Sequence, residues 1–197
     1  MRLQLLVRAA GALMLAASAA ACSAAGDHTD TYGPQNVLYR ADYPSYTTAD
    51  QLFERASVVV QGRVESAKKV VRLVQAAPQG QALPAAVDAE RREGMVVTVR
   101  TVTVSRVFKG DVKPGDVVQV KQLGGKLDGV TYSEEHGVPL LDNGQYTLFL
   151  ETYSDQPASL LNPVQAQYPV DAGNGLLSLP GNEITTSVTQ LDRLAHK

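Results

Sequence analysis

The sequence is poor in the side chains that most often carry catalysis and crosslinks. It contains one cysteine and three histidines among 197 residues. A single cysteine excludes an internal disulfide. His28 and His196 lie near the two ends of the chain, and His136 follows Glu134 and Glu135 in a polar stretch. Adjacent residues of one loop rarely converge on one ion. We therefore read this stretch as a solvated loop and predict no catalytic, cofactor-binding or metal-binding residue.

The chain also lacks a charge excess of either sign. Its 18 Lys and Arg face 20 Asp and Glu, a formal charge of -2. Because there is no basic surplus to neutralise phosphates, a general nucleic-acid binder is excluded. The chain has no nucleophile elbow, zinc-protease helix, dinucleotide turn or phosphate loop. Gly124-Gly125 reads as a turn that ends a strand, because no helix with an anion site follows it.

The first 21 residues have the organisation of a secretory signal. Arg2 and Arg8 flank the start of the chain, residues 9–21 are small and apolar, and the run ends at Cys22. The run is shorter than the roughly 20 residues that cross a bilayer as a helix. We therefore predict a signal peptide over residues 1–21 that is removed from the mature chain.

The sequence Ala19-Ala20-Ala21-Cys22 resembles the lipobox of bacterial lipoproteins. In that family the cysteine becomes the acylated first residue. The resemblance implies lipidation of Cys22 and anchoring to the bacterial cell membrane outside the cytoplasm. Two or three acyl chains hold a protein firmly at a membrane, whereas one holds it only marginally. The family prefers Leu at the position of Ala19, so ordinary signal cleavage beside an unmodified Cys22 remains the alternative.

Residues 22–46 read as a flexible tether and residues 47–197 as the folded domain. The tether contains glycine and proline and shows no apolar periodicity. It also holds four of the eight tyrosines, at Tyr32, Tyr39, Tyr43 and Tyr46. A solvated linker rarely contains so many tyrosines. Packing of residues 37–46 back onto the domain is therefore an open alternative.

Alternating valines predict that the domain is mainly β. The apolar phase changes between Val99 and Val102, which predicts a β-bulge near Arg100 and Thr101. The expected strands span 57–65 with an extension over 70–74, 95–108, 117–123 and 145–151. A short helix is expected within 47–56, a hairpin over 166–179 and a closing helix over 187–194. The expected core comprises Val58, Val60, Val64, Val102, Val104, Val118, Val120, Leu148 and Leu150.

The segments between these elements carry turn chemistry. Residues 109–116 form a turn in which Pro114-Gly115 suits type II geometry. Residues 75–94 read as an excursion loop, and residues 124–144 as a polar loop that leads into the next strand.

Residues 49–153 resemble the netrin-like module shared with metalloprotease inhibitors. The resemblance rests on the segments 56–64, 104–110 and 144–149. It implies an OB-type barrel, so the expected fold is a small OB-like barrel with a short N-terminal helix and a C-terminal helix. The chain lacks the disulfide cysteines of that module. The inhibitors chelate zinc through a free N-terminal cysteine, and an acylated Cys22 could not do so.

These observations favour a membrane-anchored binding or interaction module outside the cytoplasm. Its expected partners are the membrane, through the lipid on Cys22, and an unknown extracytoplasmic protein or ligand. An envelope hydrolase with an unrecognised site and a structural envelope component are the alternatives. A binding module should show a concave or exposed apolar patch, and an enzyme should show perturbed carboxylates or His136 in a cleft.

Overall fold

The computed structural model of the protein describes residues 35–73 and 94–197. The predicted signal peptide, Cys22 and the excursion loop up to residue 93 lie outside these ranges. The described part is mainly β with two helices, as the sequence predicts. The helices are α1 (Ala49–Arg55) and α3 (Val188–Ala195). The strands are β1 (Asn36–Tyr39), β2 (Val58–Leu73), β3 (Met95–Lys109), β4 (Val117–Leu123), β5 (Gly125–Leu127), β6 (Val130–Glu134), β7 (Gln145–Glu151), β8 (Ala158–Leu160) and β9 (Gln167–Pro169).

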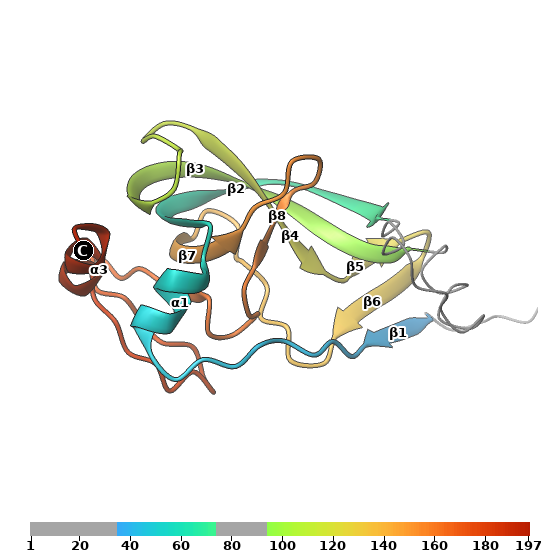
Figure 1. The fold of residues 1–197 in the computed structure, drawn as a ribbon. Helices are drawn as coiled ribbons and strands as arrows, with labels where there is room; N and C mark the ends of the chain where they lie inside the picture. The colour runs from blue at the N-terminus through green and yellow to red at the C-terminus, as the bar shows by residue number, and fades with distance from the viewer. Residues whose placement is uncertain (1–34, 74–93) are drawn as a thin grey trace, which may run out of the picture. The chain divides into compact units, whose positions relative to one another are not determined.

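Five strands close into a ring (Figure 1). β2, β3 and β4 pair antiparallel in succession, and β4 pairs parallel with β8. β8 then pairs with β7, and β7 returns to β2. β9 adds to the other side of β7. A separate three-stranded sheet has the order β1-β6-β5. The closed ring with a helix before it and a helix near the C-terminus agrees with the OB-like fold expected from the sequence.

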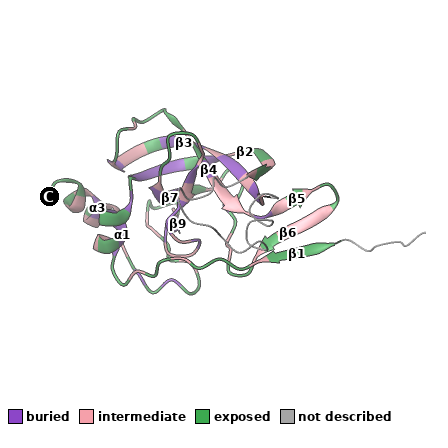
Figure 2. Ribbon diagram, turned by 45° about the vertical axis from the view of Figure 1, so that its right-hand side comes forward, coloured by how far each residue is buried: buried purple, intermediate pink, exposed green. Residues whose placement is uncertain are grey.

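The core of the ring is built from the valines and leucines that the strand alternation selects. Figure 2 shows the buried residues concentrated in β2, β3 and β7, whereas β1, β5 and β6 are mostly exposed or half-buried. Of the nine predicted core residues, all except Val118 are buried, and Val118 is half-buried against the core. The prediction of the core is confirmed. The apolar interior therefore belongs to the ring, and the small sheet packs outside it.

The bulge that the phase change predicts is present, but the extra residues belong to β2. Val64 lies opposite Val102 and Lys68 opposite Arg100, so residues 65–67 of β2 face Thr101 alone. β3 keeps continuous register with β4 across this region. The pairing of β2 with β7 ends at residue 63, and beyond that point β2 pairs only with β3. A strand paired on one side can absorb extra residues without breaking a second ladder.

Both expected helices form, and each begins after a side-chain hydroxyl that caps it. The Thr48 hydroxyl accepts a hydrogen bond from the Gln51 backbone N–H at 3.2 Å, and the Ser187 hydroxyl accepts one from Gln190 at 3.2 Å. The turn at 113–116 also forms as predicted, with Gly115 at a φ of 93°.

Three segments differ from the sequence prediction. The expected loop 124–144 contains the β5–β6 hairpin. β8 lies before residue 166, in a region where no strand is expected. The hairpin over 166–179 reduces to β9 and a single bridge between Val170 and Leu176. β5, β8 and β9 are three residues each, too short to show an alternating pattern.

Candidate functional site

A segment between β1 and α1, residues 40–46, crosses the outside of the ring and is named the strap here. Tyr43 and Tyr46 of the strap are half-buried, and the residues between them are exposed. The backbone N–H and carbonyl of Tyr46 bond the side chain of Gln165 at 3.0 and 2.9 Å. The Pro44 carbonyl accepts a hydrogen bond from Asn162 at 3.1 Å. These contacts fasten the strap to the loop that follows β8.

The other end of the strap is fastened through β1 and the small sheet. β1 pairs parallel with β6, and the Tyr39 ring stacks on Tyr132 with a centroid distance of 5.8 Å. The Tyr39 hydroxyl accepts a hydrogen bond from the Val96 backbone N–H at 2.9 Å. Arg40 forms an exposed ion pair with Glu135 at 3.1 Å. Residues 36–46, which the sequence assigns to the tether, therefore pack on the domain. The tyrosines that argued against a simple linker make many of these contacts.

A cavity of about 320 Å³ lies between the strap and the strands β3, β4 and β8, and is called the strap cleft. Its walls combine aromatic and aliphatic side chains with a few polar groups. Tyr43 and Tyr46 come from the strap, and Tyr153 comes from the segment after β7. The opposite wall includes Val97 of β3 and Leu160 of β8.

Lys121 of β4 is a cation in this cleft without an acidic partner. Its Nζ donates to Gln156 Oε1 at 2.8 Å and lies 4.4 Å from the centroid of the Tyr153 ring. Among the described residues no carboxylate lies within ion-pair distance of it. Burial lowers the pKa of the Lys121 ammonium, while the charges of Asp155 and Glu151 act in the opposite direction. The side chain is therefore held by a neutral amide and an aromatic ring rather than by an ion pair.

Glu134, the last residue of β6, is the matching anion. Its Oε1 is buried and has no hydrogen-bond partner, and no Lys or Arg of the described chain pairs with it. Burial raises the pKa of the Tyr43 phenol, and the hydrogen bond and charge of Glu134 raise it further. The neutral Tyr43 hydroxyl thus donates to the carboxyl of Glu134. The strap cleft contains one unpaired charge of each sign.

The other charges at the cleft neutralise each other. Arg55 at the end of α1 donates to Glu151 of β7 at 2.9 Å; the Arg55 side chain is exposed and the Glu151 side chain is half-buried. The Glu151 charge and hydrogen bond raise the pKa of Arg55. This rim pair leaves Lys121 and Glu134 as the charges available to a ligand.

His136 lies on the other side of the strap, where a wider cavity of about 660 Å³ is lined by Glu134, Glu135 and His136. His136 is exposed, and Glu135 already pairs with Arg40. No group of three or more His, Cys, Asp or Glu side chains in the described ranges could hold a metal ion. Cys22, the predicted lipidation site, lies outside those ranges.

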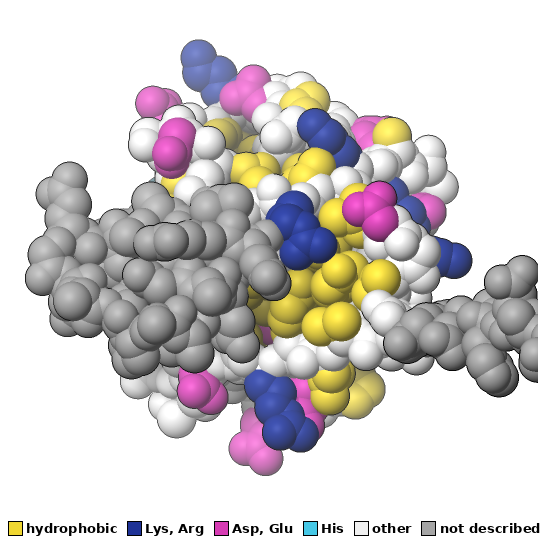
Figure 3. All heavy atoms as spheres, turned by 90° about the vertical axis from the view of Figure 1, so that its right-hand side faces the viewer, with side chains coloured by type: hydrophobic (Ala, Val, Ile, Leu, Met, Phe, Trp, Pro, Cys, Tyr) yellow, Lys and Arg dark blue, Asp and Glu magenta, His cyan; other side chains and the backbone are white. Residues whose placement is uncertain are grey.

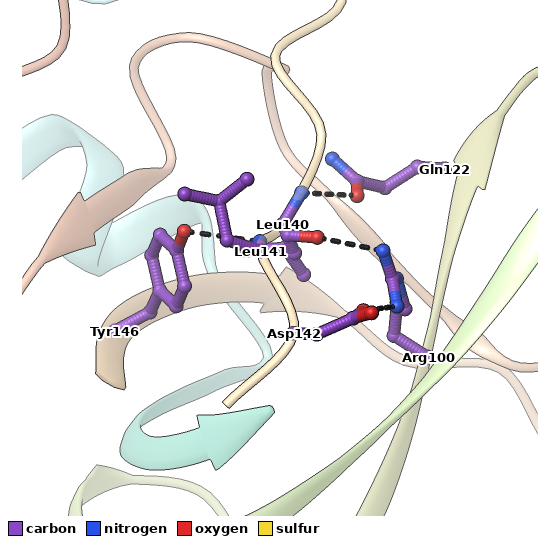
Figure 4. Close-up of polar contacts among 6 residues, drawn as sticks. All are labelled: Arg100, Gln122, Leu140, Leu141, Asp142 and Tyr146. Carbon is purple, nitrogen blue, oxygen red and sulfur yellow. Dashed lines mark hydrogen bonds and ion pairs between the residues drawn. The ribbon is translucent and has the colours of Figure 1, made fainter. Parts of the chain in front are cut away.

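A buried arginine supports the loop between β6 and β7, which follows Glu134 (Figure 4). Arg100 of β3 pairs with Asp142 and donates from Nη2 to the Leu140 carbonyl at 2.9 Å. The Leu140 N–H donates to Gln122 Oε1 at 2.8 Å. The Tyr146 hydroxyl accepts a further N–H of the loop at 3.1 Å. Figure 4 shows these side chains converging on the loop from three strands of the ring. The loop is therefore fixed by side chains where a regular ladder is absent.

Hydrophobic side chains gather at the centre of the face shown in Figure 3, with Lys or Arg side chains beside them. β1 lies toward this side of the molecule, and its Val37 and Leu38 are 38% and 54% exposed. This is an apolar surface of the kind that a binding module should show. The strap cleft is the stronger candidate, because it is a defined cavity with polar groups on its walls.

Sequence reasoning did not single out Lys121 or Glu134. Lys121 alternates with Val118 and Val120, so it belongs on the outer face of its strand. The sequence does not indicate which face of the ring the strap covers. The concentration of tyrosines before residue 47 was the available clue, because aromatic residues indicate packing.

No described helix has the length and apolar character needed to span a membrane. No known family model matches the sequence, and no curated protein matches it significantly.

Proposed function

We propose that the protein is a lipid-anchored module outside the cytoplasm of a bacterial cell, and that it binds a ligand in the strap cleft. The observation that supports this most is that Lys121 and Glu134 line one cavity and that neither forms an ion pair with another described residue. The anchor rests on residues 1–22 and the lipobox resemblance. The binding site rests on the geometry of the described domain.

Unpaired charges that are partly removed from water are unfavourable unless a partner satisfies them. A purely structural envelope protein would gain stability from pairing or replacing them. The chain makes such pairs elsewhere, for example between Arg106 and Asp192 at 2.7 Å. Leaving Lys121 and Glu134 without ion-pair partners is consistent with a ligand that supplies the missing charges.

The size and lining of the strap cleft also suit a ligand site. Small-molecule sites are usually cavities of about 300–1,000 Å³ lined by apolar and aromatic groups with a few placed polar groups. At about 320 Å³ the strap cleft falls at the small end of this range. The ligand, or the part of it that enters, should therefore be small.

A fluorinated fragment library tests the binding site, with the full chain in detergent micelles and ligand-observed ¹⁹F NMR as the readout. We expect anionic fragments to bind the wild type and to lose binding in Lys121→Met. Lys126→Met is the matched control, because Lys126 is exposed on β5 and does not line the cleft. Absence of any binding fragment, or equal binding by the two variants, would contradict the proposal.

A hydrolase is the second candidate, and one observation favours it. Lys121 lies directly opposite Ser159 in the β4–β8 register, both residues line the strap cleft, and burial lowers the pKa of the lysine. A serine activated by lysine is a known nucleophile arrangement. However, the Lys121 Nζ donates to Gln156, and no hydrogen bond joins it to Ser159. Ester hydrolysis that Ser159→Ala abolishes while ligand binding persists would favour this candidate over a binding module.

A further inference from the structure

The ligand class can be narrowed from the surroundings of Lys121. The charges of Asp155 and Glu151 act on this lysine, and Glu134 lines the same cleft. A phosphate carries nearly two negative charges, so the Asp155 and Glu134 carboxylates would repel it more strongly than a group with a single charge. A carboxylate carries one charge and can accept from a single ammonium. The group that Lys121 selects is therefore a carboxylate.

Glu134 requires a ligand group of the opposite charge. Its buried Oε1 lacks a donor, while the Tyr43 hydroxyl donates to the same carboxyl group. An ammonium brings both a positive charge and three donors, so it can neutralise the Glu134 carboxylate that lines the cleft. A neutral donor would leave the charge uncompensated. Glu134 thus selects an amine in its protonated form.

The other residues that line the cleft select an apolar body. Tyr43 and Tyr46 face it from the strap, and Val97, Leu160 and Leu161 face it from the ring. Each is an apolar or aromatic group that gains free energy when water is displaced from it. A ligand that crosses from Lys121 to Glu134 must therefore be apolar in its middle and charged at both ends.

We infer that the strap cleft binds a short apolar peptide with both termini free, its carboxylate at Lys121 and its ammonium at Glu134. This inference rests on the proposed function, because it names the ligand of the same site. A peptide meets all three demands, since its termini carry opposite charges and its side chains can be aliphatic. The small volume of the cleft limits it to very few residues.

Calorimetric titration of the full chain in detergent tests the inference with leucine, dileucine and trileucine. We expect one length of this series to bind best, because the spacing of Lys121 and Glu134 is fixed by the fold. The same peptide is then titrated with its amine acetylated or its carboxylate amidated. Each cap should weaken binding by about tenfold or more, since a hydrogen bond to a charged group contributes about 1.5–3 kcal/mol.

The variants link each terminus to its partner. In Lys121→Met, amidation of the peptide should no longer weaken binding, whereas acetylation still should. In Glu134→Gln, acetylation of the peptide should no longer weaken binding, whereas amidation still should. Lys126→Met should respond to both caps as the wild type does. Tyr43→Phe tests whether a disturbed strap causes the result in Glu134→Gln. This variant keeps the Glu134 carboxylate, so acetylation of the peptide amine should still weaken binding.

Two outcomes would overturn the inference. Capped peptides could bind as tightly as free ones, or both variants could weaken every peptide equally. Anionic fragments that bind through Lys121 while no free peptide binds would refute the peptide but leave the binding function standing. If neither fragments nor peptides bind, both proposals fail.

Discussion

Arg100 illustrates how a single side chain holds a segment that has no ladder of its own. Its side chain is 7% exposed, whereas that of its partner Asp142 is 46% exposed. Asp142 can therefore regain water if the arginine is removed. The Leu140 carbonyl cannot do so as easily, because Leu140 is completely buried. The main energetic role of Arg100 is thus to satisfy the buried loop backbone.

Replacing Arg100 by methionine should lower the free energy of unfolding by about 1–3 kcal/mol, the usual penalty for a buried acceptor left unsatisfied. Arg63→Met is the control, because Arg63 is exposed on β2, and its effect should stay within about 0.5 kcal/mol. Urea denaturation followed by circular dichroism measures both. Equal stabilities of the two variants would show that the loop does not depend on Arg100.

Tyr43 should make the domain sensitive to alkaline pH. Burial and Glu134 raise the pKa of Tyr43 above its ordinary value of 10.0, so the folded state keeps the proton that the unfolded state releases. Its contribution is present below pH 10 and is lost as the pH rises further. The stability advantage of the wild type over Tyr43→Phe should therefore shrink between pH 9 and pH 11.5 in urea titrations. A constant difference would mean that the phenol titrates normally.

At the scale of single residues, burial was predictable and chemistry was not. The alternation around Val58, Val60 and Val64 identifies the core face because a strand has a period of two. The same alternation assigns Lys121 to solvent. Its environment arises from the strap, which comes from a segment some 75 residues earlier in the chain. Contacts of this range leave no local pattern.

At the scale of elements, β2 combines two functions along one strand. Its first part pairs on both sides and closes the ring, and its second part pairs only with β3 and contains the largest of the register shifts between β2 and β3. Gly62 lies in the doubly paired part, opposite Val104 on one side and Tyr146 on the other. A Cβ at this position would lie 2.6 Å from the Thr103 carbonyl oxygen. The close approach of the two strands therefore requires a glycine.

Substitution Gly62→Ala should destabilise the domain by about 1–3 kcal/mol, the range for forcing extra volume into a packed interior. The matched control is Gly173→Ala, because a Cβ there meets only the side chain of Asp171, at 3.3 Å. Thermal melts of the two variants give the comparison. If Gly62→Ala melts with the wild type, the strands can separate without penalty and the close approach is not a constraint.

The long elements were predictable and the short ones were not. β2, β3, β4 and β7 contain enough residues for alternation to appear, and both helices have a capping hydroxyl. β8 has three residues and acquires its conformation from its neighbours β4 and β7. The strap carries no regular structure, and only its tyrosines indicated that it packs. Local sequence therefore predicted the ring but not the surface that covers it.

At the scale of the whole molecule, the proposed function needs two parts: a lipid anchor at Cys22 and a binding domain that follows it in the chain. The proposed anchor would depend on a lipid at Cys22, because the chain has no basic excess to hold it at an anionic membrane. The domain should therefore be released intact from the membrane when lipidation of Cys22 is prevented.

Replacement of Cys22 by alanine should move the protein from the membrane fraction to the soluble fraction of cells after a high-salt wash. Ser23→Ala is the control and should stay with the membranes. Immunoblots of the two fractions measure the distribution. Retention of the Cys22→Ala protein in the membrane fraction would refute the lipid anchor and leave the strap cleft unaffected.

The parallel contact of β4 with β8 has only two register pairs, Val120 with Ala158 and Lys121 with Ser159. It is the parallel seam of the ring, and Lys121 lies in it. Backbone amides at such a seam open to solvent more often than those of the longer ladders, so they exchange their hydrogens faster. A ligand held by Lys121 would restrain that opening. Occupancy of the cleft should then be visible as slowed deuterium uptake in β8, even before the ligand itself is identified.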